Sequence, residues 1–590
     1  MKLKLIKSSK ATTAYVQKTV RQGQRTTTKT VARLGTFDEI RLSTGCADPL
    51  EWCRQRVAQM TAQEREANSS VRLELKPGRR IKDGCKPLRY GGDMLLAGIY
   101  NGLGLAGICR KLQQGGKTQY DLNEILRTLV MGRILFPGSK FATREEASKF
   151  IKAPGFGLEE MYRGLSLLAK DIDGIQSAVF ANSKQLVDRN TGVVFYDCTN
   201  YYFEIEEEDE LRRRGKSKEG RPNPIVQMGM FMDYDGIPLA FVVFPGNESE
   251  QLSLQPLEEV LADSFGLTDF VVSTDAGLAS ESNRRYNITE GREYICVQSL
   301  PQLPEADRMM AIDPRGWRVA MRSGRRGPVN PDDPTQEIFN LNDIDMIKER
   351  HTRFFKEIIV EKKLKDNGKR EERVIVTYCH DFALYLKRKR QQRVAKAEKI
   401  VKRGDTKSRQ SQQDPRRYVD TVYCTADGEV AEHFSMGINR NVIEQEELLD
   451  GFYAYGTSLD DDAVDILRVR GFHGEIEHLF RTTKSLLEAR PVYLQRSERI
   501  KAHFLICFLA MTMLKILQKQ LNLNGLSIDR LIKGLREFNF NYIEDAGFIP
   551  LFQKNELTDA MQNNAGLQLD YEIIKKREMM KTYRTLMSVK

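Results

Sequence analysis

At 590 residues the chain is too long for one hydrophobic core, and its length predicts about three to five domains. Hydrophobic residues make up 41% of it and charged residues 29%, as is typical of a soluble globular protein, and the net charge of +11 favours a polyanionic partner such as nucleic acid. The nine cysteines are odd in number and scattered, without a Cys-x-x-Cys pair, which argues against a disulfide framework or a zinc knuckle and favours a reduced cytosolic compartment.

The first 37 residues predict a small basic β-sheet. Strands are expected at Leu3–Ile6, Thr13–Thr19 and Arg25–Leu34, the last two joined as a hairpin. This stretch holds nine lysines and arginines and no acid. Its cations are either ordinary solvent-facing strand positions or contacts for DNA phosphates, and the sequence leaves both open. The candidates for phosphate contact are Lys18, Arg21, Arg25 and Lys29. A helix over residues 48–70 follows, and Pro77-Gly78 marks a break.

Residues 91–182 have the apolar periodicity of a helical domain. Such a domain ahead of a catalytic core is a candidate for DNA binding, but nothing inside it marks a recognition helix, and the pattern alone favours plain helical packing. At Thr191 the pattern changes to strands, the first of which, VVFYDCTNYYFEI, contains Asp197. A hydrophobic hairpin, an amphipathic helix over residues 251–265 and a short apolar strand ending at Asp275 come next. Three strands, a helix and a fourth strand, with acids on the first and last strands, predict a ribonuclease H-like sheet.

Between about Leu300 and Tyr455, short strands, turn-rich joints and one basic helix interrupt this core and predict a β-rich insertion domain. The basic helix, Lys387–Arg403, holds nine basic residues and one acid. A face so one-sided in charge favours contact with DNA over a merely solvated helix. The expected contacts are Lys387, Arg388, Lys389 and Arg390.

The helical stretch Gly471–Arg490 carries Glu477, Arg481 and Lys484 on one stripe beside an apolar face. Taken alone, this stripe is equally typical of a solvated Glu–Arg–Lys ladder, and Asp275 before Ala-Gly is equally typical of a helix N-cap. Together with Asp197, however, the acids form a set of hard oxygen ligands of the kind that phosphodiester cleavage or transfer with two Mg²⁺ ions requires. The apolar run further along, Phe504–Leu514, is too short to span a bilayer and predicts a buried helix.

Several motifs taken together resemble the DDE transposases of bacterial insertion sequences, in the branch with a Tyr-Arg-Glu-Lys signature and a β-rich insertion domain. The resemblance lies in FYDCTNYYFE, VVSTDAGLASESN, IEHLFRTTKSLLEARPVYLQRSERIKAHFLICFLAM and the opening AYVQKTVRQGQRTTTKTVARLG, and it covers most of the chain. It implies that Asp197, Asp275 and Glu477 are the catalytic residues and the ligands of Mg²⁺ or Mn²⁺. Lys484 matches the signature lysine that holds a phosphate near the transposon end, and Arg481 lies beside it. The signature's tyrosine and arginine positions fall on Arg470 and His473, a departure that leaves Arg470 as a DNA contact.

The resemblance implies a transposase that cuts the ends of its element and joins the 3′-hydroxyl ends to target DNA by two-metal-ion phosphoryl transfer. Its partners would be double-stranded DNA, as terminal inverted repeats and target, and a second copy of the chain in the DNA complex, with no membrane. The location implied is the bacterial cytoplasm, at the nucleoid. Two other classes remain open: a ribonuclease H-like DNA nuclease without strand transfer, and a DNA-binding protein whose active site has decayed.

The fold class expected is therefore α/β multidomain, with a ribonuclease H-like catalytic core interrupted by a β-rich insertion domain and flanked by an N-terminal β module and helical domains. The expected boundaries are 1–80 for the basic β module and its helix, 81–188 for a helical DNA-binding domain, 189–299 with 456–520 for the catalytic core, 300–455 for the insertion, and 521–590 for a C-terminal helical region.

Overall fold

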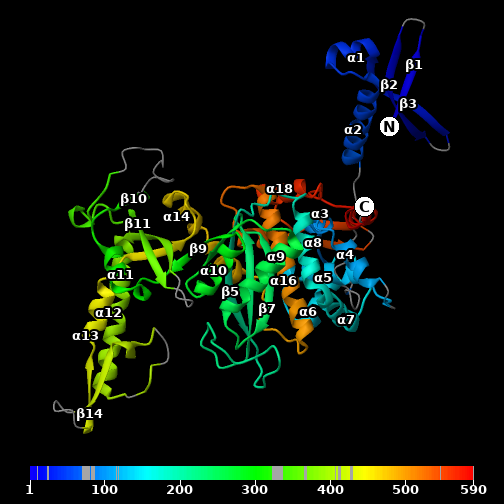
Figure 1. Ribbon diagram of the computed structural model, residues 1–590. Helices are drawn as coiled ribbons and strands as arrows, with labels where there is room; N and C mark the ends of the chain where they lie inside the picture. Colours follow the sequence, from blue (N-terminus) through cyan, green and yellow to red (C-terminus); the bar gives the residue numbers. More distant parts are fainter. Residues whose placement is uncertain are drawn as a thin grey trace. The chain divides into compact units, whose positions relative to one another are not determined.

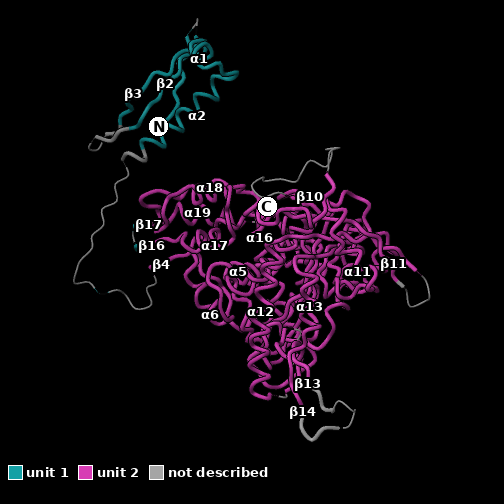
Figure 2. The backbone as a smooth tube through the Cα atoms, turned by 90° about the vertical axis from the view of Figure 1, so that its left-hand side faces the viewer, with its two compact units in different colours: residues 1–85, 543–547 teal, residues 86–542, 548–590 magenta. Residues whose placement is uncertain are grey.

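The computed structural model describes residues 1–588 except 9–10, 23–24, 69–79, 81–86, 115, 117, 322–336, 364–368, 406, 410–412, 425–429 and 545. The expected break at Pro77-Gly78 lies outside the described residues. The chain divides into two compact units, coarser than the five regions expected from sequence (Figure 2). Unit 1 comprises Met1–Cys85 with Ile543–Gly547, and unit 2 comprises Lys86–Tyr542 with Phe548–Lys590.

Unit 1 is a three-stranded antiparallel sheet with two helices. The strands β1 (Lys2–Lys7), β2 (Thr12–Gln22) and β3 (Arg25–Thr36) lie in the order β1-β2-β3, at the three positions that the sequence predicts. Helix α2 (Pro49–Asn68) is also as expected, whereas α1 (Phe37–Thr44) is not. Helix α1 begins where Thr36 accepts a hydrogen bond from the amide of Glu39 and the Glu39 carboxylate accepts one from the amide of Thr36, which together form a capping box.

The two predicted helical regions of unit 2, one on each side of the sheet in sequence, share a single core. The first contributes α3 (Gly92–Gly102), α4 (Leu105–Gln113), α5 (Leu122–Leu135), α6 (Lys140–Glu146), α7 (Leu158–Leu168) and α8 (Ile172–Ser183). The second contributes α16 (Ser497–Leu521), α17 (Ile528–Glu537), α18 (Glu556–Asn564) and α19 (Lys576–Met587). One continuous apolar cluster includes residues from both, and the small sheet β17-β16-β4 (Gly547–Pro550, Asn539–Ile543, Leu88–Tyr90) also joins them.

Helix α16 is long and apolar enough to cross a membrane by length and composition alone. In the structure, 94% of its apolar window is buried among the other helices, as expected for a core helix. The sequence-based prediction of a buried helix is therefore confirmed, although the helix is longer than the apolar run that predicted it.

A mixed sheet of nine strands is the other main element of unit 2 (Figure 1). Its first five strands in sequence are β5 (Val193–Tyr202), β6 (Ile225–Asp233), β7 (Pro238–Pro245), β8 (Val271–Thr274) and β9 (Glu293–Gln298). Strands β5, β8 and β9 are parallel, and β6 and β7 are antiparallel to their neighbours. Side chains alternate across β5: Phe195 and Tyr201 join the helical core with α16, while Tyr196 and Cys198 pack with α9 (Leu254–Phe265) on the other face.

Four strands of the region predicted as an insertion join the nine-stranded sheet, and β13 (Val419–Cys424) and β14 (Val430–Ile438) form a small sheet of their own. Strands β15 (Phe452–Thr457), β12 (Lys369–Cys379), β11 (Arg353–Lys363) and β10 (Arg318–Met321) extend the same sheet from β9 outward, each antiparallel to the next. The rest of this region is α11 (Glu305–Ile312), α12 (His380–Arg403), the pair β13 and β14, and α13 (Arg440–Glu447). The sequence pattern correctly indicates strands here, but it does not reveal that the open edge of β9 continues into them.

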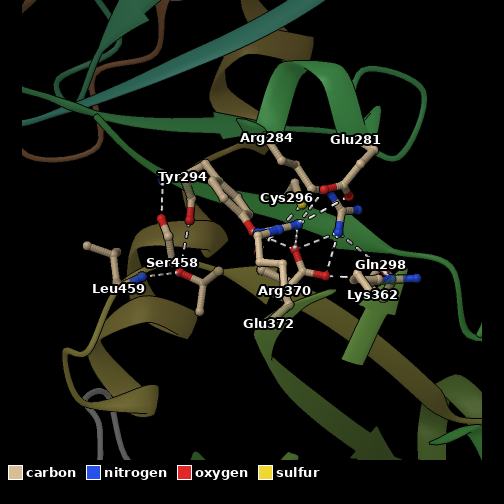
Figure 3. A network of polar contacts seen from close by, with 12 residues as sticks. Glu281, Arg284, Tyr294, Cys296, Gln298, Lys362, Arg370, Glu372, Ser458 and Leu459 are labelled. Carbon is tan, nitrogen blue, oxygen red and sulfur yellow. Dashed lines mark hydrogen bonds and ion pairs between the residues drawn. The ribbon is translucent and has the colours of Figure 1, made fainter. Parts of the chain in front are cut away.

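A buried polar network lies where the added strands meet the first five (Figure 3). The Glu372 carboxylate on β12, fully buried, accepts hydrogen bonds of 2.7 and 2.6 Å from Arg284 on α10 (Glu281–Thr289). Tyr294 on β9 donates to the same carboxylate, and Arg370 and Lys362 lie 3.4 and 3.6 Å from it. Burial opposes ionisation of Glu372, but Arg284 and the other donors outweigh it and lower the pKa of the carboxyl group. The network therefore ties β12 to β9 and α10 through charge-assisted hydrogen bonds.

Candidate active site

The parallel register of β5 and β8 brings two of the predicted acids to one level of the sheet. Val194 pairs with Val272 and Phe195 with Ser273, and β8 ends one residue later at Thr274. Asp197 and Asp275 each follow this Phe195–Ser273 pair by two residues, so the parallel register places them side by side. They lie at the carboxyl end of β8, the end at which α/β sheets bind their ligands. Asp275 does not cap a helix. It accepts a hydrogen bond of 3.1 Å from the amide of Leu278 within a turn, and α10 begins later, at Glu281, with Ser280 as its N-cap.

The carboxyl group of Asp197 is electrostatically perturbed. Burial raises the pKa of its carboxyl group to about 7, Lys218 opposes this, and the neighbouring carboxylates of Asp275 and Glu250 add to it. Two or three carboxylates close to one another and partly out of water repel, and a cation among them is stabilised.

Lys218 supplies positive charge at this point, and the sequence patterns assign it no role. Its ammonium donates to the carbonyl of Cys198, next to Asp197, and lies 3.3 Å from the Glu250 carboxylate. Burial works against this ammonium, but Asp197 and Glu250 outweigh it and raise its pKa. The signal in the sequence was the abrupt change from acidic to basic residues after the first core strand, which brings Lys218 back over that strand.

Helix α15 (Gly474–Ser485), which carries Glu477, packs on the same face of the sheet as Asp197. Its apolar residues Ile476, Leu479 and Phe480 enter the core that also contains Phe195 of β5. The His473 ring, at the start of the helix, lies 6.1 Å from the ring of Phe195, and Phe195 and Asp197 point to the same side of the strand. Glu477 itself is exposed.

The three predicted acids do not form one compact cluster. Burial raises the pKa of Tyr453 on β15, and Tyr455 and, more weakly, the charges of Asp275 and Glu477 add to the shift. Among the residues that the structure describes, no group of three or more Asp, Glu, His or Cys side chains is close enough to hold one ion. Asp197 and Asp275 alone share an edge of the sheet, and their oxygens are of the hard type that Mg²⁺ and Mn²⁺ prefer.

The predicted DNA-contacting cations of this region differ in exposure. Lys484, with 15% of its side chain exposed, lies over the Tyr201 ring at 5.2 Å and 3.9 Å from Glu219. Burial, with Lys218 nearby, lowers the pKa of Lys484 to about 8. Arg481 is exposed one turn beyond Glu477.

Arg470 lies in the last turn of α14 (Ala463–Gly471), over the ring of Tyr455 at 5.7 Å. Burial lowers the pKa of its guanidinium, while Tyr455, Tyr453 and Asp275 work in the opposite direction. Arg470 is therefore near Asp275, at the same edge as the acids. His473, the other position that departs from the family signature, is buried, and burial together with Arg470 lowers its pKa to about 3, so its imidazole is neutral.

The remaining predicted DNA contacts lie on the basic helix α12, and they differ in exposure. Lys387, Arg388 and Lys389 are exposed. Arg390 is 5% exposed, and its guanidinium donates to both carboxylate oxygens of Asp450 at 2.7 and 2.6 Å. Arg390 is thus a structural residue that holds α12 to the turn before β15, and its buried guanidinium is not free to contact DNA as the sequence predicts.

No protein-family model matches the chain, and no curated protein matches its sequence. Among solved structures, a piggyBac transposase synaptic complex with hairpin DNA, determined by cryo-EM, aligns over 83% of this chain and 84% of that chain. The identity is 8% and the TM-score 0.35, so this likeness is too weak to indicate a function.

Proposed function

We propose that the chain is a DNA transposase of the DDE type, which cuts the ends of its element and joins the 3′-hydroxyl ends to target DNA. The observation that carries this is the register of β5 with β8, which brings Asp197 level with Asp275 below the helix that bears Glu477. The strand order β7-β6-β5-β8-β9, with β5, β8 and β9 parallel, is the order of a ribonuclease H-like core and supports that assignment.

Asp197 and Asp275 would hold the first Mg²⁺ or Mn²⁺ ion, and Glu477 would join them from α15. When bound, such ions supply Lewis-acid stabilisation of the oxygens that attack and leave the phosphorus. Independently of these ions, the chain's own side chains balance the negative charge of the carboxylates. Lys218 favours the ionised form of Asp197, because its ammonium opposes the effect of burial on that carboxyl group.

The cations around this edge would bind the DNA backbone. Lys484 and Arg470 flank the acids from α15 and α14, and Arg481 is exposed on the same helix as Glu477. Lys387, Arg388 and Lys389 on α12 would extend the contact along the duplex. A dimer holding two element ends, and a cytoplasmic location at the nucleoid, stay predictions.

The experiment is incubation of the full-length chain with duplexes that carry the element's own ends, with and without Mg²⁺. Cleavage at the ends, followed by joining of pre-cut 3′-hydroxyl ends to a target plasmid, supports a transposase. Cleavage without joining would instead identify a nuclease. Binding without cleavage, under conditions where Asp197→Asn behaves like the wild type, would identify a DNA-binding protein whose active site has decayed.

A further inference from the structure

The loop between β5 and β6 places a carboxylate against two cations at and beyond the end of α15. Glu219 accepts a hydrogen bond from the guanidinium of Arg490, 271 residues further along the chain, and its carboxylate lies 3.9 Å from the ammonium of Lys484. Glu219 and Arg490 are both partly exposed, with 27% and 28% of their side chains reaching solvent. An anion from solvent can therefore compete with Glu219 for its partners.

Further positive charge lies against Tyr202, the last residue of β5. The guanidinium carbon of Arg221 lies 4.1 Å from the centroid of the Tyr202 ring, and that of Arg490 lies 5.6 Å from it. Among the residues that the structure describes, no carboxylate pairs with Arg221. Arg221, Lys484 and Arg490, which we call the cation cluster, therefore carry more charge than Glu219 balances.

A tight turn tied to β5 holds Glu219 in this position. The hydroxyl of Ser217 accepts hydrogen bonds from the amides of Glu219 and Arg221 at 3.2 and 3.3 Å. Asn200, buried on β5, accepts a hydrogen bond of 3.3 Å from the amide of Lys218. Because the backbone of the turn is fixed, Glu219 can leave its partners by rotation of its side chain alone.

The expected strength of the pair between Glu219 and Arg490 suits a contact that exchanges. Ion pairs near solvent shift an equilibrium by at most about fivefold. The pair of Arg189 with Asp233, by contrast, has side chains only 1% and 0% exposed, and its separation would leave a buried charge uncompensated. An arginine binds phosphate with the same planar donors that bind a carboxylate, so a phosphate can replace Glu219 but not Asp233.

An open cavity of about 550 Å³ gives an anion access to Arg490. Its wall is formed by Gly138, Ser139, Glu488, Arg490, Pro491 and Tyr493. Glu488 is the acid of this wall. Burial lowers the pKa of Arg133 and of Arg536, and the charge of Glu488 opposes this in both, so Glu488 has cations of its own nearby. Arg490 is thus the cation that a strand entering this cavity meets.

We propose that Glu219 is an internal stand-in for a backbone phosphate of DNA. In the free protein its carboxylate occupies the place beside Arg490 and Lys484, and a phosphate of a bound strand displaces it toward solvent and pairs with the cation cluster. The proposal rests on the proposed function for Lys484 as a DNA contact, and it adds an internal competitor and two further cations, Arg221 and Arg490, to that site. A duplex that makes few other contacts would then bind more weakly, because it must first displace Glu219.

The test is a double-mutant cycle in the full-length chain, measured as the affinity for a labelled duplex of arbitrary sequence without Mg²⁺, since phosphate contacts carry no sequence information. Glu219→Gln should strengthen binding by about fivefold, because the competitor is removed. In an Arg490→Gln background the same substitution should change the affinity by less than about twofold, because the pair no longer exists. Both partners are partly exposed, so hydrogen exchange of the β5 amides should be unchanged in each variant.

The matched control is Glu207→Gln, which removes the same charge from an exposed position of the same loop and should change the affinity by less than about twofold. Arg221→Gln tests the cation cluster without breaking the pair of Glu219 with Arg490. It should weaken binding and lower the slope of log K against log salt by about 0.9, as expected for one lost phosphate contact.

Four results would overturn the proposal: no gain in affinity with Glu219→Gln, an equal gain with Glu207→Gln, the same gain in both Arg490 backgrounds, or no loss with Arg221→Gln. Cleavage of end duplexes with Mg²⁺ decides the proposed function separately. The expected coupling in a chain that cuts no DNA refutes the transposase and supports the stand-in. Cleavage by a chain whose cycle shows no coupling does the reverse.

Discussion

The substitution Glu372→Gln removes the one carboxylate at the centre of the network between the added strands and the first five. Arg284, with 8% of its side chain exposed, then loses two hydrogen bonds to an anion and keeps only a neutral acceptor. Arg370 and Lys362 lose the same partner while 17% and 21% of their side chains reach solvent.

Removing one member of a buried ion pair costs about 3–5 kcal/mol, because the remaining charge stays buried without compensation. Glutamine keeps the shape of the side chain and one acceptor, and two of the three cations are partly hydrated. We therefore expect a loss near the lower end, about 3 kcal/mol, in the local stability of β9 and β12. The matched control is Glu361→Gln on β11, whose partner Lys369 and own side chain are both half or more exposed, and which should cost less than about 1 kcal/mol.

Amide hydrogen exchange measures this locally, which matters in a chain of two units where one unfolding temperature is not well defined. Peptides covering residues 293–298 and 369–379 should exchange roughly a hundredfold faster in Glu372→Gln than in the wild type, since about 1.4 kcal/mol corresponds to tenfold. Equal exchange in the variant, the control and the wild type would refute the argument that this network holds the two parts of the sheet together.

The same network makes the local stability of β9 and β12 depend on pH. The pKa of Glu372 is lowered from its ordinary value of 4.5, so the folded state favours the carboxylate. Its contribution is fully present above about pH 4.5 and is lost as the pH falls through the lower, folded pKa. Acid should therefore lower the protection factor, the exchange rate of an unstructured chain divided by the observed rate at the same pH, more in the wild-type peptides than in those of Glu372→Gln.

Asp197→Asn and Glu477→Gln should each lower Mg²⁺-dependent end cleavage by more than about a hundredfold while leaving DNA binding intact in gel-shift assays, and full activity in either would remove that acid from the site. End binding should weaken between pH 7 and 9, since the pKa of Lys484 is lowered to about 8 and its charge is lost as the pH rises, and Lys484→Met should flatten that profile in fluorescence anisotropy. Arg390→Met should destabilise α12 by about 3 kcal/mol in hydrogen exchange, because it leaves Asp450 unpaired, whereas the exposed Arg388→Met should affect DNA binding and not exchange. The opposite pattern would indicate that Arg390 contacts DNA.

The sequence by itself determined the local elements. Alternation in residues 1–34, the β-branched run around Asp197 and the apolar stripe beside Glu477 each indicate a strand or helix that the structure contains. These patterns succeed because they depend on neighbours in the chain, namely which side chains face a core at period 2 or 3.6.

Only the tertiary structure decided which charged side chains of those elements face solvent and which pair with a counter-ion. Lys18 and Arg390, both expected to contact DNA, are paired with Glu64 and Asp450, and Lys218 comes to Asp197 through a loop whose path no periodicity reveals. Strand pairing of β9 with β15, whose paired residues Cys296 and Gly456 are 160 apart in the chain, likewise continues the sheet into the region predicted as an insertion. In each case the partner is distant in sequence, and whether a charge faces water or a counter-ion depends on packing that no local pattern encodes.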